Sequence, residues 1–230
     1  MSTSRFPSPW HLNALAIICL LLPIASQAKE HLLILGDSLG AGYGVSLDQR
    51  WSTLLQARLD RQYPGTWTVV NASISGETTD GGLRRLPALL DKYRPVLVLV
   101  ELGGNDGLRG FPLDVTQQNL EAMVAKVQKT GAQTLLIGIR LPPNYGPRYT
   151  EAFAKIYSTV AERYKVPLVP FLLAGIYDQP GMMQGDGLHP TAKAQPQVLD
   201  VVWPKLAPLV APSQRGASDS KNSTARRSDQ

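Results

Sequence analysis

The chain has 230 residues, 43% of them hydrophobic and 18% charged, a composition typical of one globular domain and unlike that of a disordered or fibrous chain. The formal net charge is +5, and no basic run is long enough to indicate nucleic-acid binding. The single cysteine, Cys19, excludes an internal disulfide framework and a multi-thiolate metal site.

Residues 1–28 are predicted to be a signal peptide. An apolar run covers Leu12–Ile24, Arg5 is the only charged residue before Lys29, and Ser26-Gln27-Ala28 offers small residues for cleavage. The run of about 13 residues is short for a membrane span, which needs about 20. We therefore expect cleavage after Ala28, export to the periplasm and no stable membrane insertion. A retained membrane anchor is the alternative.

Residues 29–210 are predicted to form one domain in which short apolar strands alternate with amphipathic helices. Such alternation is typical of a parallel sheet covered by helices, an α/β fold. The predicted strands are Leu32–Leu35, Trp67–Ala72, Val96–Val100, Thr134–Ile139 and Val166–Pro170. The predicted helices between them are Trp51–Tyr63, Leu83–Tyr93, Val115–Thr130 and Tyr149–Tyr164.

A last helix is expected from about Thr191 to Leu209, bent or broken near Pro196 and Pro204, because proline removes a helical hydrogen bond. Residues 211–230 are rich in Ser, Arg and Asn and have almost no large apolar side chains. Such a segment buries too little surface to offset its ordering entropy. It is predicted to be a disordered tail.

Polar and glycine-rich segments follow the predicted strands. Because the carboxyl ends of parallel strands meet at one edge of a sheet, we expect these segments to form one crevice. They are Asp37-Ser38, Ser73-Ile74-Ser75-Gly76, Gly103-Gly104-Asn105-Asp106 and Arg140-Leu141-Pro142-Pro143-Asn144-Tyr145.

Ser38 is a candidate nucleophile, and it needs a histidine base with an orienting carboxylate. Of the three histidines, His11 lies in the signal and His31 begins the first strand, about 17 Å from its far end at about 3.3 Å per residue. His189 remains, with Asp186 three residues before it. In the alternative reading, Asp186 caps a turn and His189 is a surface residue. A metal site is not expected, since one histidine beside one aspartate falls short of three or four ligands.

Three groups are candidates to stabilise an oxyanion at this crevice. They are the backbone N–H of Ser38 at a helix start, the backbone N–H of Gly76 and the side-chain amide of Asn105. Glycine at position 76 would let a substrate approach the backbone closely. Taken singly, Gly76 and Asn105 are also ordinary turn-forming residues.

Four segments together resemble the blocks of the GDSL, or SGNH, hydrolase family, in order and at compatible spacing. The similarity runs from about His31 to Val210 and includes the longer matches Asn71–Gly76 and Val100–Phe111. The four blocks are Gly36-Asp37-Ser38-Leu39, Gly76, Gly103-Gly104-Asn105-Asp106 and Asp186-Gly187-Leu188-His189.

The resemblance implies a flavodoxin-like three-layer α/β/α sandwich with a central parallel sheet. It implies catalytic Ser38, Asp186 and His189, and an oxyanion hole of Ser38, Gly76 and Asn105. It also implies a loop, 107–112, that moves over a bound acyl chain, with Pro112 departing from the family pattern. Ordinary loop packing is the alternative for its apolar residues. The implied substrate-binding residues are Gly107, Leu108, Arg109, Phe111, Leu141, Pro142 and Tyr145.

We therefore expect a monomeric, exported serine esterase and thioesterase that needs no cofactor or metal and binds no nucleic acid. Its expected substrates are acyl esters and thioesters: arylesters, acyl-CoA and lysophospholipids. Since acyl-CoA is cytoplasmic, a lysophospholipid or another fatty ester is the expected natural substrate outside the cytoplasm. The alternatives are a carbohydrate O-deacetylase of the same fold and a non-catalytic lipid- or glycan-binding module.

Overall fold

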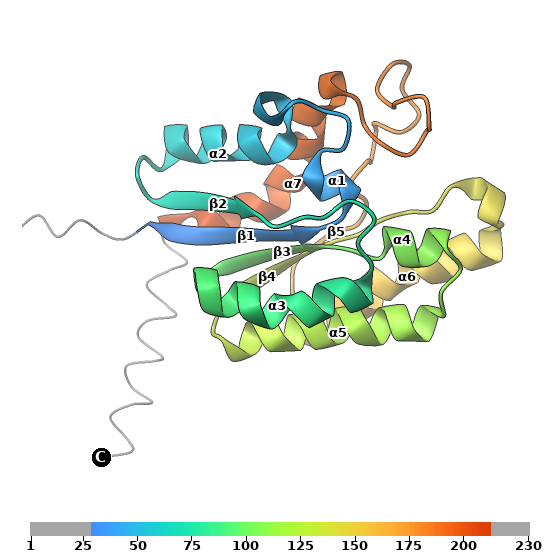
Figure 1. The fold of residues 1–230 in the computed structure, drawn as a ribbon, viewed down its shortest axis with the longest axis horizontal. Helices are drawn as coiled ribbons and strands as arrows, with labels where there is room; N and C mark the ends of the chain where they lie inside the picture. The colour runs from blue at the N-terminus through green and yellow to red at the C-terminus, as the bar shows by residue number, and fades with distance from the viewer. Residues whose placement is uncertain (1–28, 213–230) are drawn as a thin grey trace, which may run out of the picture.

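The computed structural model describes residues 29–212, which form one five-stranded parallel sheet covered by helices on both faces. The strands lie in the order β2-β1-β3-β4-β5, the flavodoxin-like order (Figure 1). The strands are β1 (Glu30–Gly36), β2 (Trp67–Asn71), β3 (Leu97–Glu101), β4 (Gln133–Ile137) and β5 (Leu168–Val169).

Side chains of each strand alternate between two cores, one on each face of the sheet. Along β1, Leu32 and Ile34 pack into one core, whereas Leu33 and Leu35 pack into the other. All four are fully buried. The sequence of this strand is therefore a continuous apolar run, without the alternating polar residues of a strand with one exposed face.

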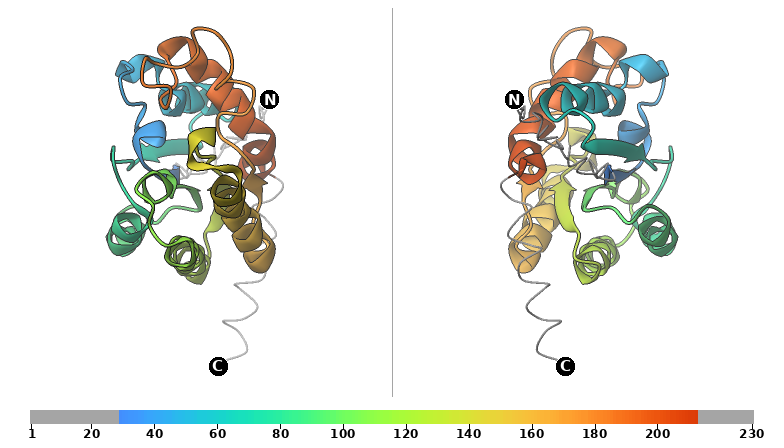
Figure 2. Two further views of the ribbon diagram at one scale, coloured as in Figure 1. Left: turned by 90° about the vertical axis from the view of Figure 1, so that its right-hand side faces the viewer. Right: turned by 90° about the vertical axis from the view of Figure 1, so that its left-hand side faces the viewer.

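Helices cover both faces, so the predicted three-layer α/β/α sandwich is confirmed (Figures 1 and 2). On one face lie α2 (Trp51–Gln62) and α7 (Gln195–Val210), and on the other lie α3 (Thr79–Tyr93), α5 (Leu113–Lys129) and α6 (Pro147–Tyr164). Short helical turns complete the chain: α1 (Ser38–Ala41), η1 (Leu47–Gln49), α4 (Gly104–Leu108), η2 (Pro143–Tyr145) and η3 (Ala192–Ala194).

The last helix, expected to be bent or broken near Pro196 and Pro204, is not broken. The helix α7 runs on from Gln195 to Val210 with Pro204 and Pro208 inside it. Pro196 stands in the first turn, where a backbone N–H has no helical partner to lose. The helix continues through Pro204 because the face of α7 opposite this exposed proline is buried against the sheet. This tertiary packing outweighs the low helix propensity of proline.

The predicted signal peptide, 1–28, lies outside the described residues, as does the predicted tail apart from residues 211 and 212. Between residues 29 and 212, none of the helices has the length and apolar character required to cross a membrane.

Candidate active site

The predicted crevice lies at the carboxyl ends of the strands, between β1 and β3. In the order 2-1-3-4-5, successive strands are added toward one edge of the sheet up to β2 and toward the other edge from β3 on, and open α/β sheets place their sites at such a switch point. Ser38 begins α1 directly after β1, and Asn105 lies in α4 directly after β3. Figure 1 shows α1 and α4 side by side at this end of the sheet.

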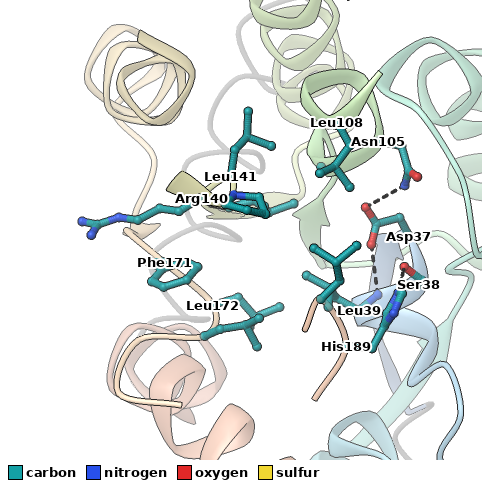
Figure 3. A pocket seen from close by; sticks show the side chains of 15 residues that line it. Asp37, Ser38, Leu39, Asn105, Leu108, Arg140, Leu141, Phe171, Leu172 and His189 are labelled. Atoms are coloured by element: carbon teal, nitrogen blue, oxygen red, sulfur yellow. Dashed lines mark hydrogen bonds between the residues drawn. The ribbon is translucent and has the colours of Figure 1, made fainter. Parts of the chain in front are cut away.

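The structure brings the three predicted triad residues together in a hydrogen-bonded chain. His189 Nε2 lies 2.8 Å from Ser38 Oγ, and His189 Nδ1 lies 2.7 Å from Asp186 Oδ2. Figure 3 shows the side chains of Ser38 and His189 next to each other. These distances are those of a nucleophile, a base and an orienting carboxylate.

Asp186 is held as a carboxylate by the donors around it. Its Oδ1 accepts the backbone N–H groups of Leu188 and His189 at 2.9 and 3.0 Å. The hydrogen bond from the His189 ring is the largest cause that lowers the pKa of Asp186 to about 2, and burial opposes it only in part. An ionised Asp186 accepts a hydrogen bond from the N–H at Nδ1 of His189. This tautomer leaves the lone pair of Nε2 facing Ser38.

The loop that carries His189 is fixed from two sides. Within the loop, the Gln184 N–H donates to the His189 carbonyl at 2.8 Å, and Met183 forms an antiparallel bridge with Pro190. Across the site, Gln184 Nε2 donates to the Tyr43 carbonyl at 2.8 Å, and the Tyr43 ring lies 4.8 Å from the imidazole. The predicted base, His189, is therefore tied to the segment that follows the predicted nucleophile, Ser38.

His31, the other histidine of residues 29–212, does not belong to this site. It lies near the amino-terminal end of β1, at the end of the sheet opposite the site, where its Nδ1 contacts the Tyr93 carbonyl. Over the same residues, no group of three or more His, Cys, Asp or Glu side chains is placed to hold a metal ion.

One backbone N–H of the turn after β1 has no acceptor in the described part of the chain: that of Ser38. The N–H groups of Asp37 and Gly40 donate to the Glu101 carboxyl, at 3.3 and 2.9 Å. The N–H of Leu39 donates to the Asp37 side chain at 3.0 Å, and that of Ala41 donates to the Asp37 carbonyl at 2.9 Å. An open donor therefore remains at the predicted oxyanion position.

The turn after β2 presents a second open donor. Gly76 has a φ of +80°, a left-handed conformation that favours glycine. Its carbonyl accepts Arg109 Nη2 at 3.1 Å, whereas its N–H has no acceptor among residues 29–212. The position fits the predicted second oxyanion donor.

Asn105 differs from the other two predicted donors, because its amide hydrogens are already engaged. Its Nδ2 lies 3.1 Å from Asp37 Oδ2 and 3.0 Å from the Glu77 carbonyl. An amide nitrogen carries two hydrogens, so Asn105 can serve an oxyanion only by sharing or releasing one of these bonds.

Glu101 is a residue of the site that sequence reasoning missed. It ends β3 and is fully buried, and burial raises its pKa well above the ordinary value, with the nearby Asp37 carboxylate adding to the effect. Burial likewise raises the pKa of Asp37 to about 6. The available signal was an acidic residue that directly follows a continuous apolar strand, Leu97–Val100.

An apolar cavity of about 180 Å³ opens beside Ser38 and His189. Figure 3 shows Asn105, Asp37, Ser38 and His189 on one side of it, with Leu141, Phe171 and Leu172 opposite and the Arg140 guanidinium directed away. The predicted substrate-binding residues that line this cavity are Leu108, Leu141 and Pro142.

The other four predicted substrate-binding residues do not line this cavity. Gly107 is buried, and a Cβ there would lie 2.7 Å from the Phe153 ring. Arg109 donates to the Gly76 carbonyl, and Phe111 is exposed. The Tyr145 hydroxyl donates to the Leu108 carbonyl at 3.0 Å and so ties η2 to the end of α4.

A second groove of about 690 Å³, lined by apolar, polar and charged side chains, adjoins the first. The two share six lining residues and therefore lie side by side. From there the groove extends to Ala154 of α6 and to Tyr177 and Met183. The shared residues are Arg140, Leu141, Pro142, Phe171, Leu173 and Leu188.

The sequence profile of the GDSL-like lipase/acylhydrolase family matches residues 34–195, which include β1, the Ser38 turn and the His189 loop. The chain therefore belongs to the GDSL-like lipase/acylhydrolase family, and the predicted family and class of ester-hydrolysing enzyme are confirmed.

Two named relatives are similar in sequence to this chain over nearly their whole length. Esterase TesA of Pseudomonas aeruginosa is 53% identical over 195 residues, which are 84% of this chain and 96% of that protein. Thioesterase 1/protease 1/lysophospholipase L1 of Escherichia coli is 48% identical over 201 residues, 87% of this chain and 94% of that one. The crystal structure of TesA matches with a TM-score of 0.77 at 54% identity, covering 79% of this chain and 100% of that chain.

Proposed function

We propose that this protein is a serine esterase and thioesterase in which Ser38 is the nucleophile, His189 the general base and Asp186 the group that orients His189. The observation that carries the proposal is the hydrogen-bonded chain from Ser38 Oγ through His189 to Asp186, with distances of 2.8 and 2.7 Å. An ionised Asp186 stabilises the imidazolium that forms when His189 takes the serine proton.

In the acylation step, Ser38 Oγ bonds to the carbonyl carbon of the substrate and its proton passes to His189 Nε2. The backbone N–H groups of Ser38 and Gly76 donate to the developing oxyanion, and each such donor is worth about 3 kcal/mol. Asn105 joins them by releasing a resting-state bond. The carbonyl–oxygen or carbonyl–sulfur bond then breaks, and His189 gives its proton to the leaving group.

In the deacylation step, water attacks the acyl-enzyme ester and gives a proton to His189. The bond between the acyl carbon and Ser38 Oγ breaks, and His189 returns the proton to the serine oxygen. The fatty acid leaves and the resting hydrogen bonds re-form. None of these steps needs a cofactor.

The apolar lining of the cavity supports an acyl chain as the bound part of the substrate. A volume of about 180 Å³ lies below the range of about 300–1,000 Å³ typical of ligand pockets. A long chain would therefore continue into the adjoining groove, which holds about 690 Å³. The name of the Escherichia coli relative, which includes thioesterase and lysophospholipase, supports the same substrate class.

We further propose that the protein is exported as a monomer to the periplasm and acts there on lysophospholipids or other fatty esters. The support is the apolar run Leu12–Ile24, followed by small residues at 26–28. N-terminal sequencing of the mature protein should begin at Lys29. A chain that still begins at Met1 would favour a retained anchor.

A chain-length series of p-nitrophenyl esters and acyl thioesters, with a lysophospholipid included, tests the substrate class. The proposal requires kcat/KM to be higher for chains of eight or more carbons than for acetyl. A preference for acetyl would favour the carbohydrate O-deacetylase instead. Absence of turnover on every ester and thioester would favour a non-catalytic binding module.

A further inference from the structure

The buried carboxyl of Glu101 holds the backbone on both sides of Ser38. Its Oε2 accepts the N–H of Gly40 at 2.9 Å and that of Asp37 at 3.3 Å. Glu101 is the last residue of β3, and its Cα pairs with that of Gly36 in β1. One side chain from the neighbouring strand therefore binds the residue before the nucleophile and the residue two after it.

Two glycines make room for this carboxyl. A Cβ on Gly36 would lie 2.6 Å from Glu101 Oε2 and 2.9 Å from Ser73 Oγ. A Cβ on Gly40 would lie 2.9 Å from the same carboxyl oxygen and 2.5 Å from the serine oxygen. Glycine at both positions is thus matched to a side chain more than sixty residues away, which a plain turn would not require.

The contacts of Glu101 decide which donor of the turn stays open. If the N–H groups of Asp37 and Gly40 lacked this acceptor, they would be buried without a partner, and the turn would rearrange to satisfy them. With Glu101 in place, every N–H from 37 to 41 except that of Ser38 has an acceptor among the described residues.

We propose that Glu101 is a positioning residue: by accepting the N–H groups of Asp37 and Gly40, it fixes the turn so that the Ser38 hydroxyl faces His189 and the Ser38 N–H faces the oxyanion. This inference rests on the proposed serine mechanism. Glu101 does not line the cavity beside Ser38, so its proposed action is on the turn and not on a bound substrate.

The chemistry of a buried carboxyl supplies a conservative replacement. Burial raises the pKa of Glu101 well above its ordinary value, which favours the neutral acid form of the group. A neutral acid accepts through its carbonyl oxygen, as a glutamine amide does. Glu101→Gln therefore keeps the acceptor, whereas Glu101→Leu keeps comparable bulk and removes it.

The test compares steady-state kinetics of the two variants with those of the parent. Glu101→Leu should lower kcat about 10- to 100-fold with KM within about twofold, since displacement of a reacting group can cost about 100-fold. Glu101→Gln should recover kcat to within about threefold. Phosphonylation by an alkyl p-nitrophenyl phosphonate, in which Ser38 Oγ displaces nitrophenolate from phosphorus, should slow by the same factor as kcat.

Val100→Ala is the matched control, because Val100 is the fully buried neighbour of Glu101 on β3 and does not contact the turn through a hydrogen bond. It should lower the melting temperature and leave kcat within about twofold, measured well below that temperature. If Glu101→Leu does not fold, Glu101→Asp replaces it, because the shorter side chain cannot reach both amides; the same loss of kcat is expected.

The inference is overturned if a folded Glu101→Leu, or Glu101→Asp in its place, keeps the parent kcat. It is also overturned if Glu101→Gln is no better than the variant it should rescue, or if Val100→Ala loses as much kcat. Failure of the serine mechanism would show separately, as ester turnover that survives Ser38→Ala.

Discussion

Asp37 Oδ2 accepts a hydrogen bond from Asn105 Nδ2 at 3.1 Å, and this bond joins the turn after β1 to the helix after β3. The other carboxylate oxygen caps α1 by accepting the Leu39 N–H at 3.0 Å. One side chain thus orients the nucleophile turn and holds the amide of a predicted oxyanion donor. Asp37, the residue before the proposed nucleophile, therefore links two segments of the resting site.

Replacement of Asp37 by Asn should separate these two contacts. The asparagine Oδ1 can still accept the Leu39 N–H, but its NH₂ would face the NH₂ of Asn105 and lose that bond. We expect kcat to fall about tenfold with little change in KM, the pattern of an interaction made in the transition state. Asp48→Asn, at an exposed position of η1, is the control and should match the parent. An unchanged kcat for Asp37→Asn would contradict this role.

The raised pKa of the Asp37 carboxyl predicts how the free energy of unfolding depends on pH. Burial is the largest cause that raises the pKa of Asp37 from 3.8 to about 6, and Asp106 adds to it, while the Leu39 N–H, His189 and Asn105 oppose it. Between those two pH values the native state therefore binds more protons than the unfolded state. The free energy of unfolding should fall as pH rises through this window.

Urea denaturation at several pH values within the window measures this slope. Asp37→Asn should make it shallower without removing it, because Glu101, whose pKa is also raised by burial, contributes with the same sign. Asp186 acts in a lower window, since its pKa of about 2 adds stability as pH rises from there to 3.8. Identical slopes for parent and Asp37→Asn would rule out a proton held on the native Asp37.

The cavity beside Ser38 and the adjoining groove share lining residues, which predicts a way to change chain-length preference. Ala154 lines the far groove but not the cavity beside Ser38. Ala154→Trp should lower kcat/KM for long acyl esters by about tenfold or more and leave butyryl esters within about twofold. Ala152→Trp, on an exposed position of the same helix, should leave the profile unchanged. Equal losses for short and long chains would show that the acyl chain does not enter this groove.

The strands and the long helices were predictable because their patterns span many residues. The apolar run of β1 and the repeat of Leu120, Met123, Val124 and Val127 in α5 both report burial directly. The short helices α1 and α4 have four and five residues, too few for a periodic signal. Local contacts such as the Asp37 cap define them instead.

The candidate site was predictable where the number of suitable residues is small. Of the two histidines in residues 29–212, His31 lies at the other end of β1, which leaves His189 to face Ser38. Glu101 could not be recognised in this way, because its role depends on strand pairing with β1, which no local pattern reports. The engagement of both Asn105 hydrogens likewise depends on the packing of α4 against the turns after β1 and β2.

The central claim is that Ser38 is the nucleophile and His189 its base, and the kinetics of Ser38→Ala and His189→Ala on a long-chain p-nitrophenyl ester test it most directly. Both variants should fold as the parent does and lose about 10⁴-fold or more in kcat, because residues of one triad act as a unit. The two losses should be similar, since His31 cannot replace His189. Turnover within tenfold of the parent in either variant would contradict the account.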